Sequence, residues 1–354
     1  MRTLLFLLIT FIVSGNTYAQ ESVFKRSGDR KISSFKAVSK MDDASVIQAA
    51  VYFQNITKKN IVVNERNAMG GVLGKYAGAK SDGHSASAAL TAYLVFSDGE
   101  PDDSEYQQAV DEFYTYLNQK LEQNAVKSIP WETFSSSKYF SQLTDDKEAE
   151  KEIEELNKKG NAWKIFTANK GPRIIRYNPM NHTYNAPAVK GTVRMANYGK
   201  EVKTSTLLAL NIIIDFADIY LEGEAHSGTT NRSYSSVKWQ NSTIKYDISP
   251  NVRITSRDNG GNQIFVFPTK SKSFDEIYSA DDVRSALPLN GKLTQDASLI
   301  QKRSFFDYLP SKGTKHSIDP FVVEISKADY FNAVNDALKK YADSLADAIK
   351  EVKK

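Results

Sequence analysis

Two stretches of the chain repeat apolar side chains at the spacing of an α-helix. In the first, apolar residues recur every three or four positions, at Tyr106, Val110, Phe113, Leu117 and Leu121. This spacing places them on one stripe of a helix. Asp102 precedes the stripe and Glu105 follows three residues later, which is the pattern of a capping box, and Lys120 lies near the end. The pattern predicts an amphipathic helix that begins at Asp102.

The end of the chain shows the same periodicity. Ser326 and Asp329 have capping-box spacing, and an apolar seam then continues to Val352. Such a seam either covers its own domain, which is how most amphipathic helices are stabilised, or pairs with a helix of a partner or a second copy. The candidate partner-binding residues are Phe331, Val334, Leu338, Tyr341, Leu345 and Ile349. A further, solvated helix is expected in the charge-rich residues 145–159.

Period-two and β-branched runs predict strands in the N-terminal half. Residues 46–56, 86–96 and 126–131 are rich in Val, Ile, Tyr, Phe or Leu. The first predicted helix lies between the second and third of these runs, so residues 86–131 are expected to form a strand–helix–strand unit. Residues 68–83 contain five glycines and are expected to be a flexible loop.

From residue 162 the pattern changes to short β-like runs. They are residues 163–167, 173–177, 189–195, 206–221, 237–248, 252–256 and 263–267. Asn259-Gly260 separates the last two, which predicts a tight hairpin. Between residues 206 and 221 the even positions from Leu208 to Phe216 are apolar, whereas Asn211 and Asp215 interrupt the other face. This asymmetry predicts a half-buried sheet.

These elements predict an α+β protein with an α/β-type region and a β-rich region. We expect a strand–helix–strand region over 44–165, an antiparallel β-rich region over 166–325 and a long amphipathic helix over 326–354. Residues 20–43 are polar and basic, and we expect them to be a loose arm or a weak edge strand.

The first 19 residues have the composition of a secretory signal peptide. A basic start is followed by an apolar run over residues 4–13 and by small residues Thr17 and Ala19. The run is shorter than the roughly 20 apolar residues that span a bilayer. We therefore expect cleavage after Ala19, export, and no transmembrane helix in the mature chain.

The amino-acid composition further restricts the cellular location and the kinds of site that the chain can have. The chain has no cysteine, which excludes disulfides, thiolate nucleophiles, cysteine metal sites and an N-terminal lipid-modified cysteine. The absence of cysteine from an exported chain of this size fits a bacterial periplasm or cell exterior. Asn-x-Ser/Thr triplets at Asn55, Asn181, Asn231 and Asn241 favour a eukaryotic source weakly. The net charge of +4 gives no reason to expect a nucleic-acid partner, and no motif implies a cofactor.

Three local motifs fall short of the sites they resemble. Residues 83–87 lack the second glycine of a nucleophile elbow and precede a strand. Residues 69–76 begin with Met and end with Tyr where a phosphate loop needs Gly and Ser or Thr. A weak calcium candidate remains at Asp98, Glu100 and Asp102, although a helix cap explains these acids more simply.

The remaining ionisable candidates are dispersed. The histidines at positions 84, 182, 226 and 316 have no metal-ligand spacing. Asp215 and Asp218 lie in an apolar strand, where burial could raise a carboxylate pKa, but three residues apart they should point to opposite faces. A hydrolase would need Asp215, Asp218, His226 or His84 to converge in one pocket.

The sequence favours a non-catalytic binding or structural protein of the envelope or exterior, with an unknown ligand. A first alternative is an outer-membrane-associated assembly or secretion component. The order of elements resembles that of curli-type secretion channels, in which an α/β body carries amphipathic hairpins, and residues 206–256 would be the hairpin. Those channels carry a lipid-anchoring cysteine, which this chain lacks, and no functional residue is carried over. A secreted hydrolase without a recognisable local motif is the second alternative.

Overall fold

The structure is a computed structural model. It describes residues 24–26, 38–64, 85–138, 140, 151, 153–154, 163–178, 183–185, 192–232, 235–256, 262–270, 274–296 and 314–353. The expected signal peptide, the glycine-rich loop 68–83, the turn at 258–261, most of the expected helix 145–159, His84 and His182 lie outside these residues.

A nine-stranded sheet forms the body, and its central strand is β9 (Thr206–Arg232). Strand β2 (Asp43–Gln54) pairs in parallel with the first part of β9. The other edge of β2 pairs with β5 (Lys127–Ser128), in parallel, and with β6 (Trp163–Thr167), antiparallel. The other edge of β9 pairs with β10 (Ser235–Ile254) and with β11 (Gln263–Pro268). Strand β13 (Val283–Arg284) pairs with β10. Strand β12 (Asp275–Ser279) pairs with β11, and β1 (Phe24–Arg26) pairs with β12 at the edge of the sheet.

A second sheet has five strands. Strand β4 (Ser85–Phe96) lies between β3 (Ile56–Asn64), which is antiparallel to it, and β15 (Thr314–Ser317) and β16 (Phe321–Ile325), which are parallel to it. Strand β14 (Lys292–Gln295) continues beyond β16. A separate pair is formed by β7 (Arg176–Asn178) and β8 (Thr183–Asn185).

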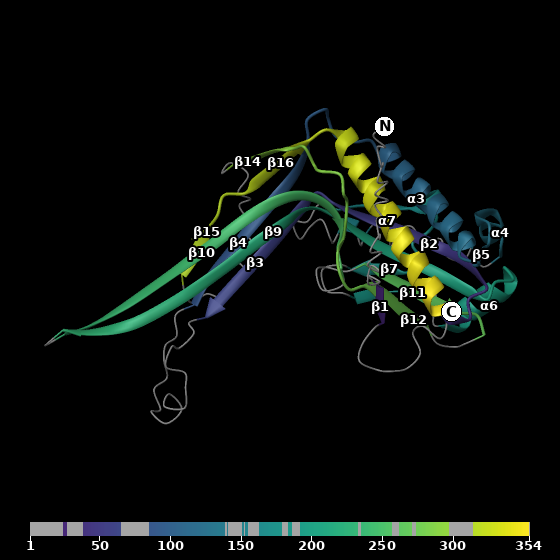
Figure 1. Cartoon of the computed structure of the whole chain (residues 1–354), viewed down its shortest axis with the longest axis horizontal. Coiled ribbons are helices and arrows are strands. Elements are labelled where there is room, and N and C mark those ends of the chain that lie inside the picture. Colours follow the sequence, from purple (N-terminus) through teal and green to yellow (C-terminus); the bar gives the residue numbers. More distant parts are fainter. Residues whose placement is uncertain are drawn as a thin grey trace, which may run out of the picture.

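Two long helices lie side by side on one face of the large sheet (Figure 1): α3 (Asp103–Gln123) and α7 (Lys327–Lys353). The backbone N–H of Asp102 donates to the Glu105 carboxylate at 2.8 Å, so the predicted cap is present. Lys120 on α3 pairs with Asp343 on α7 at 2.8 Å. These two helices bury the even-numbered side of β9, including Leu210, together with their own apolar stripes.

Short helices cover part of the opposite face. They are α4 (Trp131–Ser135) and α6 (Thr192–Glu201), and the 3-10 turn η2 (Ala168–Lys170) precedes the β7–β8 pair. Phe134 and Tyr198 from these helices pack with Leu207 of β9. Gly199 of α6 lies so close to Thr269 that an added Cβ would be 1.9 Å from the threonine methyl carbon. A glycine is therefore needed for this approach of α6 to the sheet.

The mixed α+β class is confirmed, as are both long helices and the strands near residues 46–56, 86–96, 163–167 and 263–267. The sheets draw strands from both expected regions, and both sheets contain parallel as well as antiparallel pairs. Within the described part of residues 166–325 the strands pair antiparallel with one another, as expected, and the parallel pairs all involve β2 or β4 of the N-terminal region. Strands β4 and β5, which flank α3 in the chain, lie in different sheets, so they do not form a unit of two neighbouring strands.

The hairpin predicted across Asn259-Gly260 is wrong. Strand β10 pairs with β9 residues 214–232 and β11 pairs with β9 residues 206–211, both antiparallel. Because β2 occupies the other edge of β9 over residues 207–214, β10 and β11 follow one another along the same edge. The two strands therefore run in the same direction and are partners of β9 instead of each other.

Two further expectations are corrected. Residues 189–195 were expected as a strand, but residues 192–201 form α6, because Met195, Tyr198 and Val202 lie on one buried helical face. The sheet at β9 is buried on both faces over residues 206–217. Asn211 is accommodated there because its side chain accepts a hydrogen bond from Gln48 at 2.9 Å.

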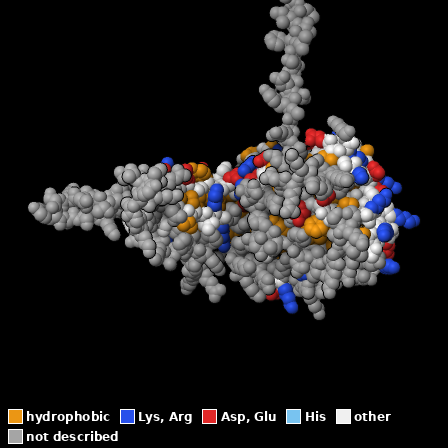
Figure 2. All heavy atoms as spheres, turned by 90° about the horizontal axis from the view of Figure 1, so that it is seen from below, with side chains coloured by type: hydrophobic (Ala, Val, Ile, Leu, Met, Phe, Trp, Pro, Cys, Tyr) orange, Lys and Arg blue, Asp and Glu red, His pale blue; other side chains and the backbone are white. Residues whose placement is uncertain are grey.

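The molecule is elongated. Strands β9 and β10 leave the body as a two-stranded ribbon that runs beside the five-stranded sheet and continues beyond the ends of β3, β4 and β15 (Figure 1). On the face shown in Figure 2, lysine and arginine side chains are interspersed with carboxylates over the broad end of the molecule. No helix in the described part of the chain is both long enough and apolar enough to cross a membrane.

Candidate functional site: the β9–β10 ribbon and its charged base

The β9–β10 ribbon is the largest projecting feature of the described chain. Its two strands keep one antiparallel register from the Ile219–Ile248 pair to the Arg232–Ser235 pair. At about 3.3 Å per residue, the stretch from Phe216 to Arg232 spans roughly 50 Å. A two-stranded ribbon alone is marginally stable in water, so its base must be supported.

The lower part of the ribbon packs on the five-stranded sheet. Leu221, Ala225 and Ile248 are buried there. The Lys59 ammonium on β3 donates to the carbonyl of Ile219 at 3.0 Å. This packing stabilises the first half of the ribbon by burying one of its faces.

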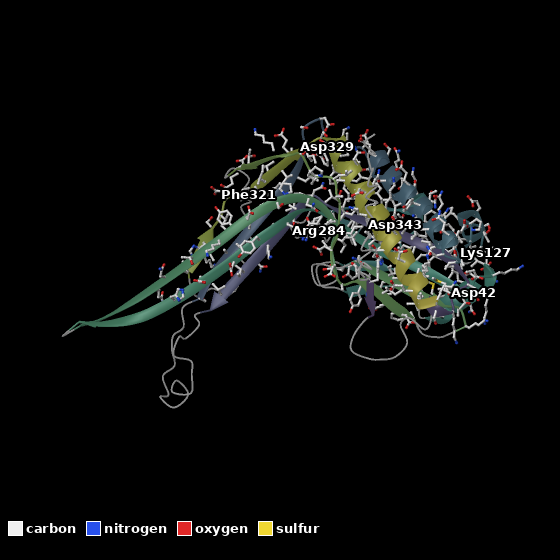
Figure 3. All side chains as sticks on the ribbon, in the orientation of Figure 1. Asp42, Lys127, Arg284, Phe321, Asp329 and Asp343 are labelled. Atoms are coloured by element: carbon white, nitrogen blue, oxygen red, sulfur yellow. The ribbon has the colours of Figure 1, made fainter. Side chains whose placement is uncertain are left out.

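Strand β10 of the ribbon also contacts two strands of the five-stranded sheet, β15 and β16. Ser242 Oγ lies 2.7 Å from His316 Nε2 on β15, and the Tyr246 ring lies 6.2 Å from the Phe321 ring, which is labelled in Figure 3. These contacts join β10 to β15 and β16. The sheet therefore supports both strands of the ribbon.

The outward face of the ribbon is polar. On β9, Tyr220, Glu222, Glu224 and His226 are exposed, and Tyr220 donates a hydrogen bond to Glu222. Their partners on β10 include the exposed Lys245 and Asp247. A face of this composition suits water or a polar partner and does not suit hydrocarbon.

A buried ion cluster fixes the base of the ribbon. Arg253 on β10 donates to Asp215 at 2.9 Å, to Asp282 at 3.0 Å and to Asp218. Arg284 on β13 pairs with Asp282 at 3.1 Å and with Asp218. Figure 3 places Arg284 between the ribbon and α7. Three carboxylates and two guanidinium groups thus meet where the ribbon leaves the body.

An irregularity in β10 accompanies this geometry. The register shifts between Pro250 and Arg253, where β10 carries one residue more than β9. Such a bulge bends the strand and redirects its side chains. Burial opposes the charge of Arg253, but Asp215, Asp218 and Asp282 outweigh that effect and raise its pKa.

Buried polar atoms that have no hydrogen-bond partner among the described residues include Arg253 Nε and the hydroxyls of Tyr106 and Tyr330. Burial, followed by the nearby Tyr106 and Asp215, raises the pKa of Tyr330 well above its ordinary value. The phenol is therefore neutral at physiological pH and cannot serve as a base there.

Asp215 and Asp218 were expected on opposite faces of their strand. Arg253 contacts both, and Asp215 is buried whereas Asp218 is partly exposed. The Asp215 carboxylate also accepts from Thr57 Oγ1 at 3.1 Å. His226 lies farther along the ribbon with Glu224 at 3.5 Å, and His84 is outside the described residues. Arg253 thus brings Asp215 and Asp218 together, whereas His226 lies elsewhere on the ribbon.

The three calcium candidates lie beside the first turn of α3. Asp98 accepts a hydrogen bond from the backbone N–H of Lys327 at 2.9 Å, and Asp102 precedes α3 as its cap residue. Among the residues that the structure describes, no group of three or more His, Asp or Glu side chains is placed to hold a metal ion.

The apolar seam of α7 faces the interior. Val334, Leu338, Tyr341, Leu345 and Ile349 are buried in the main core, and Phe331 is partly buried against it. A partner that used these six residues would have to displace α7 from its own sheet.

Sequence reasoning missed Arg253, Asp282 and Arg284 as members of a site. Arg253 lies between Val252 and Ile254 in a β-like run, and a lone charge in such a run was the available signal. The Ser242–His316 contact was also missed, because its members are 74 residues apart in the chain.

A polar groove follows the outer side of α3. Its volume is about 960 Å³, and Gln107, Asp111 and Thr115 lie along it, between Lys170 and Lys339. Gln107 donates to Asp111 at 3.0 Å, and the backbone N–H of Asn169 donates to the same carboxylate at 2.6 Å. The side chains thus satisfy one another, and nothing in the groove identifies a ligand.

The comparisons with known proteins do not assign the chain to a family. No protein-family model matches it, and neither the curated proteins nor the solved structures give a significant match. The class that the structure defines is a mixed α+β protein with a projecting two-stranded ribbon.

Proposed function

We propose that this protein is an exported, non-catalytic binding protein of the bacterial envelope or exterior, and that the β9–β10 ribbon is its binding element. The observation that carries the proposal is the ribbon itself, whose base is held by the Arg253 cluster and whose far end extends beyond its supporting sheet. Loops and projections held on a rigid scaffold are common places for recognition.

The electrostatics of the cluster fit a structural support. Arg253 and Asp215 are nearly buried and bind each other, so neither is presented to a substrate. The exposed outward face of the ribbon instead offers hydroxyl, carboxylate, imidazole and ammonium groups to a polar protein surface.

Site-specific photocrosslinking in the native host tests this role. A photoreactive amino acid at Tyr220, which is 51% exposed on the ribbon, should give adducts with a partner. The matched control is the same substitution at Glu122, an exposed residue near the end of α3. Adducts from Glu122 alone would assign binding to the body and contradict the proposal.

The second candidate is an outer-membrane-associated assembly or secretion component. It is favoured by the observation that β9 residues 214–232 and β10 residues 235–254 pair antiparallel as the two strands of a long ribbon. The polar outward face of the described ribbon weighs against it.

Fractionation of the host separates the two candidates. Recovery of the mature chain in the soluble periplasmic or extracellular fraction supports the binding protein. Retention in a salt-washed membrane pellet would favour the assembly component, whereas a cytosolic precursor-sized chain would contradict export.

A further inference from the structure

The far part of β9 has an open backbone edge. In the described structure, β9 residues 224–232 pair with β10 alone, whereas residues 207–214 pair with β2 on the other edge. Strand β3 packs on a face of the ribbon near Gly223, where an added Cβ would be 3.3 Å from a Val63 methyl carbon, and it ends at Asn64 with β4 as its ladder partner. Beyond this point no described strand covers that edge.

The sequence along this edge is complementary to itself. Glu224 and Arg232 lie four residues before and four residues after Gly228. If two copies of β9 pair antiparallel about Gly228, position 224 of each copy stands opposite position 232 of the other. Opposite charges at directly opposite positions stabilise an antiparallel pair, whereas like charges there destabilise it.

Gly228 suits the centre of such a pair. Glycine within a strand weakens it when nothing else is gained, and it often marks a place where another backbone approaches closely. The stretch on either side, residues 224–232, contains no proline, the residue that most directly blocks pairing at an edge.

We propose that a second copy of this chain pairs with the open edge of β9, antiparallel and two-fold symmetric about Gly228. The product is a four-stranded sheet in the order β10–β9–β9–β10, with residues 224–232 of each copy in the new pairing. This inference rests on the proposed role of the ribbon as the binding element and names the partner. A two-fold contact uses the same surface on both copies, which the spacing of Glu224 and Arg232 provides.

The edge of β10 is a poorer choice for the same contact. Ser242 and Tyr246 of β10 already contact His316 and Phe321. The remaining residues 235–241 carry Lys238 and no acid, so this stretch has no complementary charge of its own.

A single cysteine tests the symmetry axis. The chain has no cysteine, so Gly228→Cys in the full mature protein introduces one thiol. Opposite residues of an antiparallel pair have Cα atoms about 4.5–5.5 Å apart, which a disulfide can span. Mild oxidation should therefore give a disulfide-linked dimer. The control Ser236→Cys, on β10 of the same ribbon, should remain largely monomeric after denaturation without reductant.

Charge reversal supplies the second test. Sedimentation equilibrium of Glu224→Arg and of Arg232→Glu should each show a dimer dissociation constant raised about tenfold or more over the wild type. The double variant Glu224→Arg/Arg232→Glu restores opposite charges across the pair and should recover most of the wild-type value. A double variant as weak as the single variants would contradict the proposed register.

Some results would contradict the β9–β9 pairing without bearing on the proposed binding role of the ribbon, which the photocrosslinking experiment tests separately. A wild-type chain that stays monomeric at all concentrations, or equal crosslinking of the two cysteine variants, removes the two-fold β9 contact. Assemblies larger than a dimer would indicate pairing of β9 with β10 of the next copy. Adducts between Tyr220 and a different protein, with a monomeric chain, would retain the binding function and reject the second copy as partner.

Discussion

At the scale of single residues, Arg253 is the charged side chain whose removal should lower the stability of the fold most. It is held among three aspartates, of which Asp215 and Asp282 are almost inaccessible to water. A buried ion pair adds little net stability over an apolar replacement of the whole set, but removal of one partner leaves charges buried and unpaired. Loss of Arg253 should therefore lower stability mainly because it leaves the buried carboxylates of Asp215 and Asp282 with fewer compensating charges.

We expect Arg253→Leu to lower the free energy of unfolding by about 3–5 kcal/mol. Arg284→Leu is the matched control, because the Arg284 side chain is 46% exposed and Arg253 continues to neutralise its partners. Its expected loss is about 1 kcal/mol or less. Urea denaturation measures both values. Equal losses would mean that burial does not determine the energetics of this cluster.

The buried tyrosines of α7 provide a second comparison. No described residue hydrogen-bonds to the hydroxyl of Tyr330, whereas that of Tyr341 donates to Asn262 at 3.3 Å. We expect Tyr330→Phe to be neutral or slightly stabilising, and Tyr341→Phe to cost about 1 kcal/mol. Thermal unfolding of the two variants checks this order. A larger loss in Tyr330→Phe would indicate a buried water that its hydroxyl binds.

At the scale of elements, α7 is held at both its start and its middle. The backbone N–H of Asp329 donates to Ser326 Oγ at 3.1 Å, as the capping pattern predicted. Asp336 accepts from the backbone N–H of Ala286 at 2.7 Å and from Ser285 Oγ at 3.0 Å. The second contact connects α7 to the segment that follows β13.

The Asp336 contact predicts a dependence of stability on pH. Partial burial opposes its ionisation, but the Ala286 N–H, Lys340 and Ser285 bonds outweigh this and lower its pKa. The resulting stability is complete above the unfolded-state pKa of about 3.9 and is lost as the pH falls through the lower folded-state value. Asp336→Asn should therefore lose less stability than the wild type between about pH 4 and pH 2.

Urea denaturation at a series of pH values measures this effect. Ser285→Ala removes one of the bonds to Asp336 and should give an intermediate slope. Parallel curves for the wild type and Asp336→Asn would show that the carboxylate does not contribute to acid unfolding.

The elements that the sequence predicted correctly are those defined by local periodicity. Tyr106 to Leu121 and Val334 to Ile349 repeat every three or four residues, and the helices follow them. The predictions that failed concern strands whose pairing is determined by residues far away in the sequence. Asn259-Gly260 has the residues of a hairpin turn, but the strands on either side of it both pair with β9. In the Arg253 cluster, Arg284 pairs with Asp218, which lies 66 positions earlier in the chain. Pairing over such distances leaves no periodic mark in the sequence.

At the scale of the whole molecule, β9 belongs both to the body and to the ribbon. Its first half pairs with β2 and β11, and its second half pairs with β10 along the ribbon. Strand β9 is a single strand across both parts. The body and the lower ribbon should therefore unfold as one cooperative unit.

A shortened ribbon tests this arrangement. Replacement of residues 227–240 by an Asn-Gly turn joins His226 to Asn241, which are register partners, and retains Leu221, Ala225 and Ile248 in the core. We expect one thermal transition within a few degrees of the wild type. Ile248→Ala is the control, and loss of its buried side chain should lower the midpoint of that single transition, by about 4 °C or more. Two separate transitions would contradict a shared unit.

The shared strand also determines how the molecule would carry a mechanical load. A pull on the tip along the ribbon axis passes through β9 directly into the middle of the body sheet. There β9 is hydrogen-bonded on both edges, to β2 and to β11. Many of these bonds would be sheared together instead of opening one at a time. The protein is thus built to resist extension at its tip more strongly than peeling at β1, the edge strand of three residues.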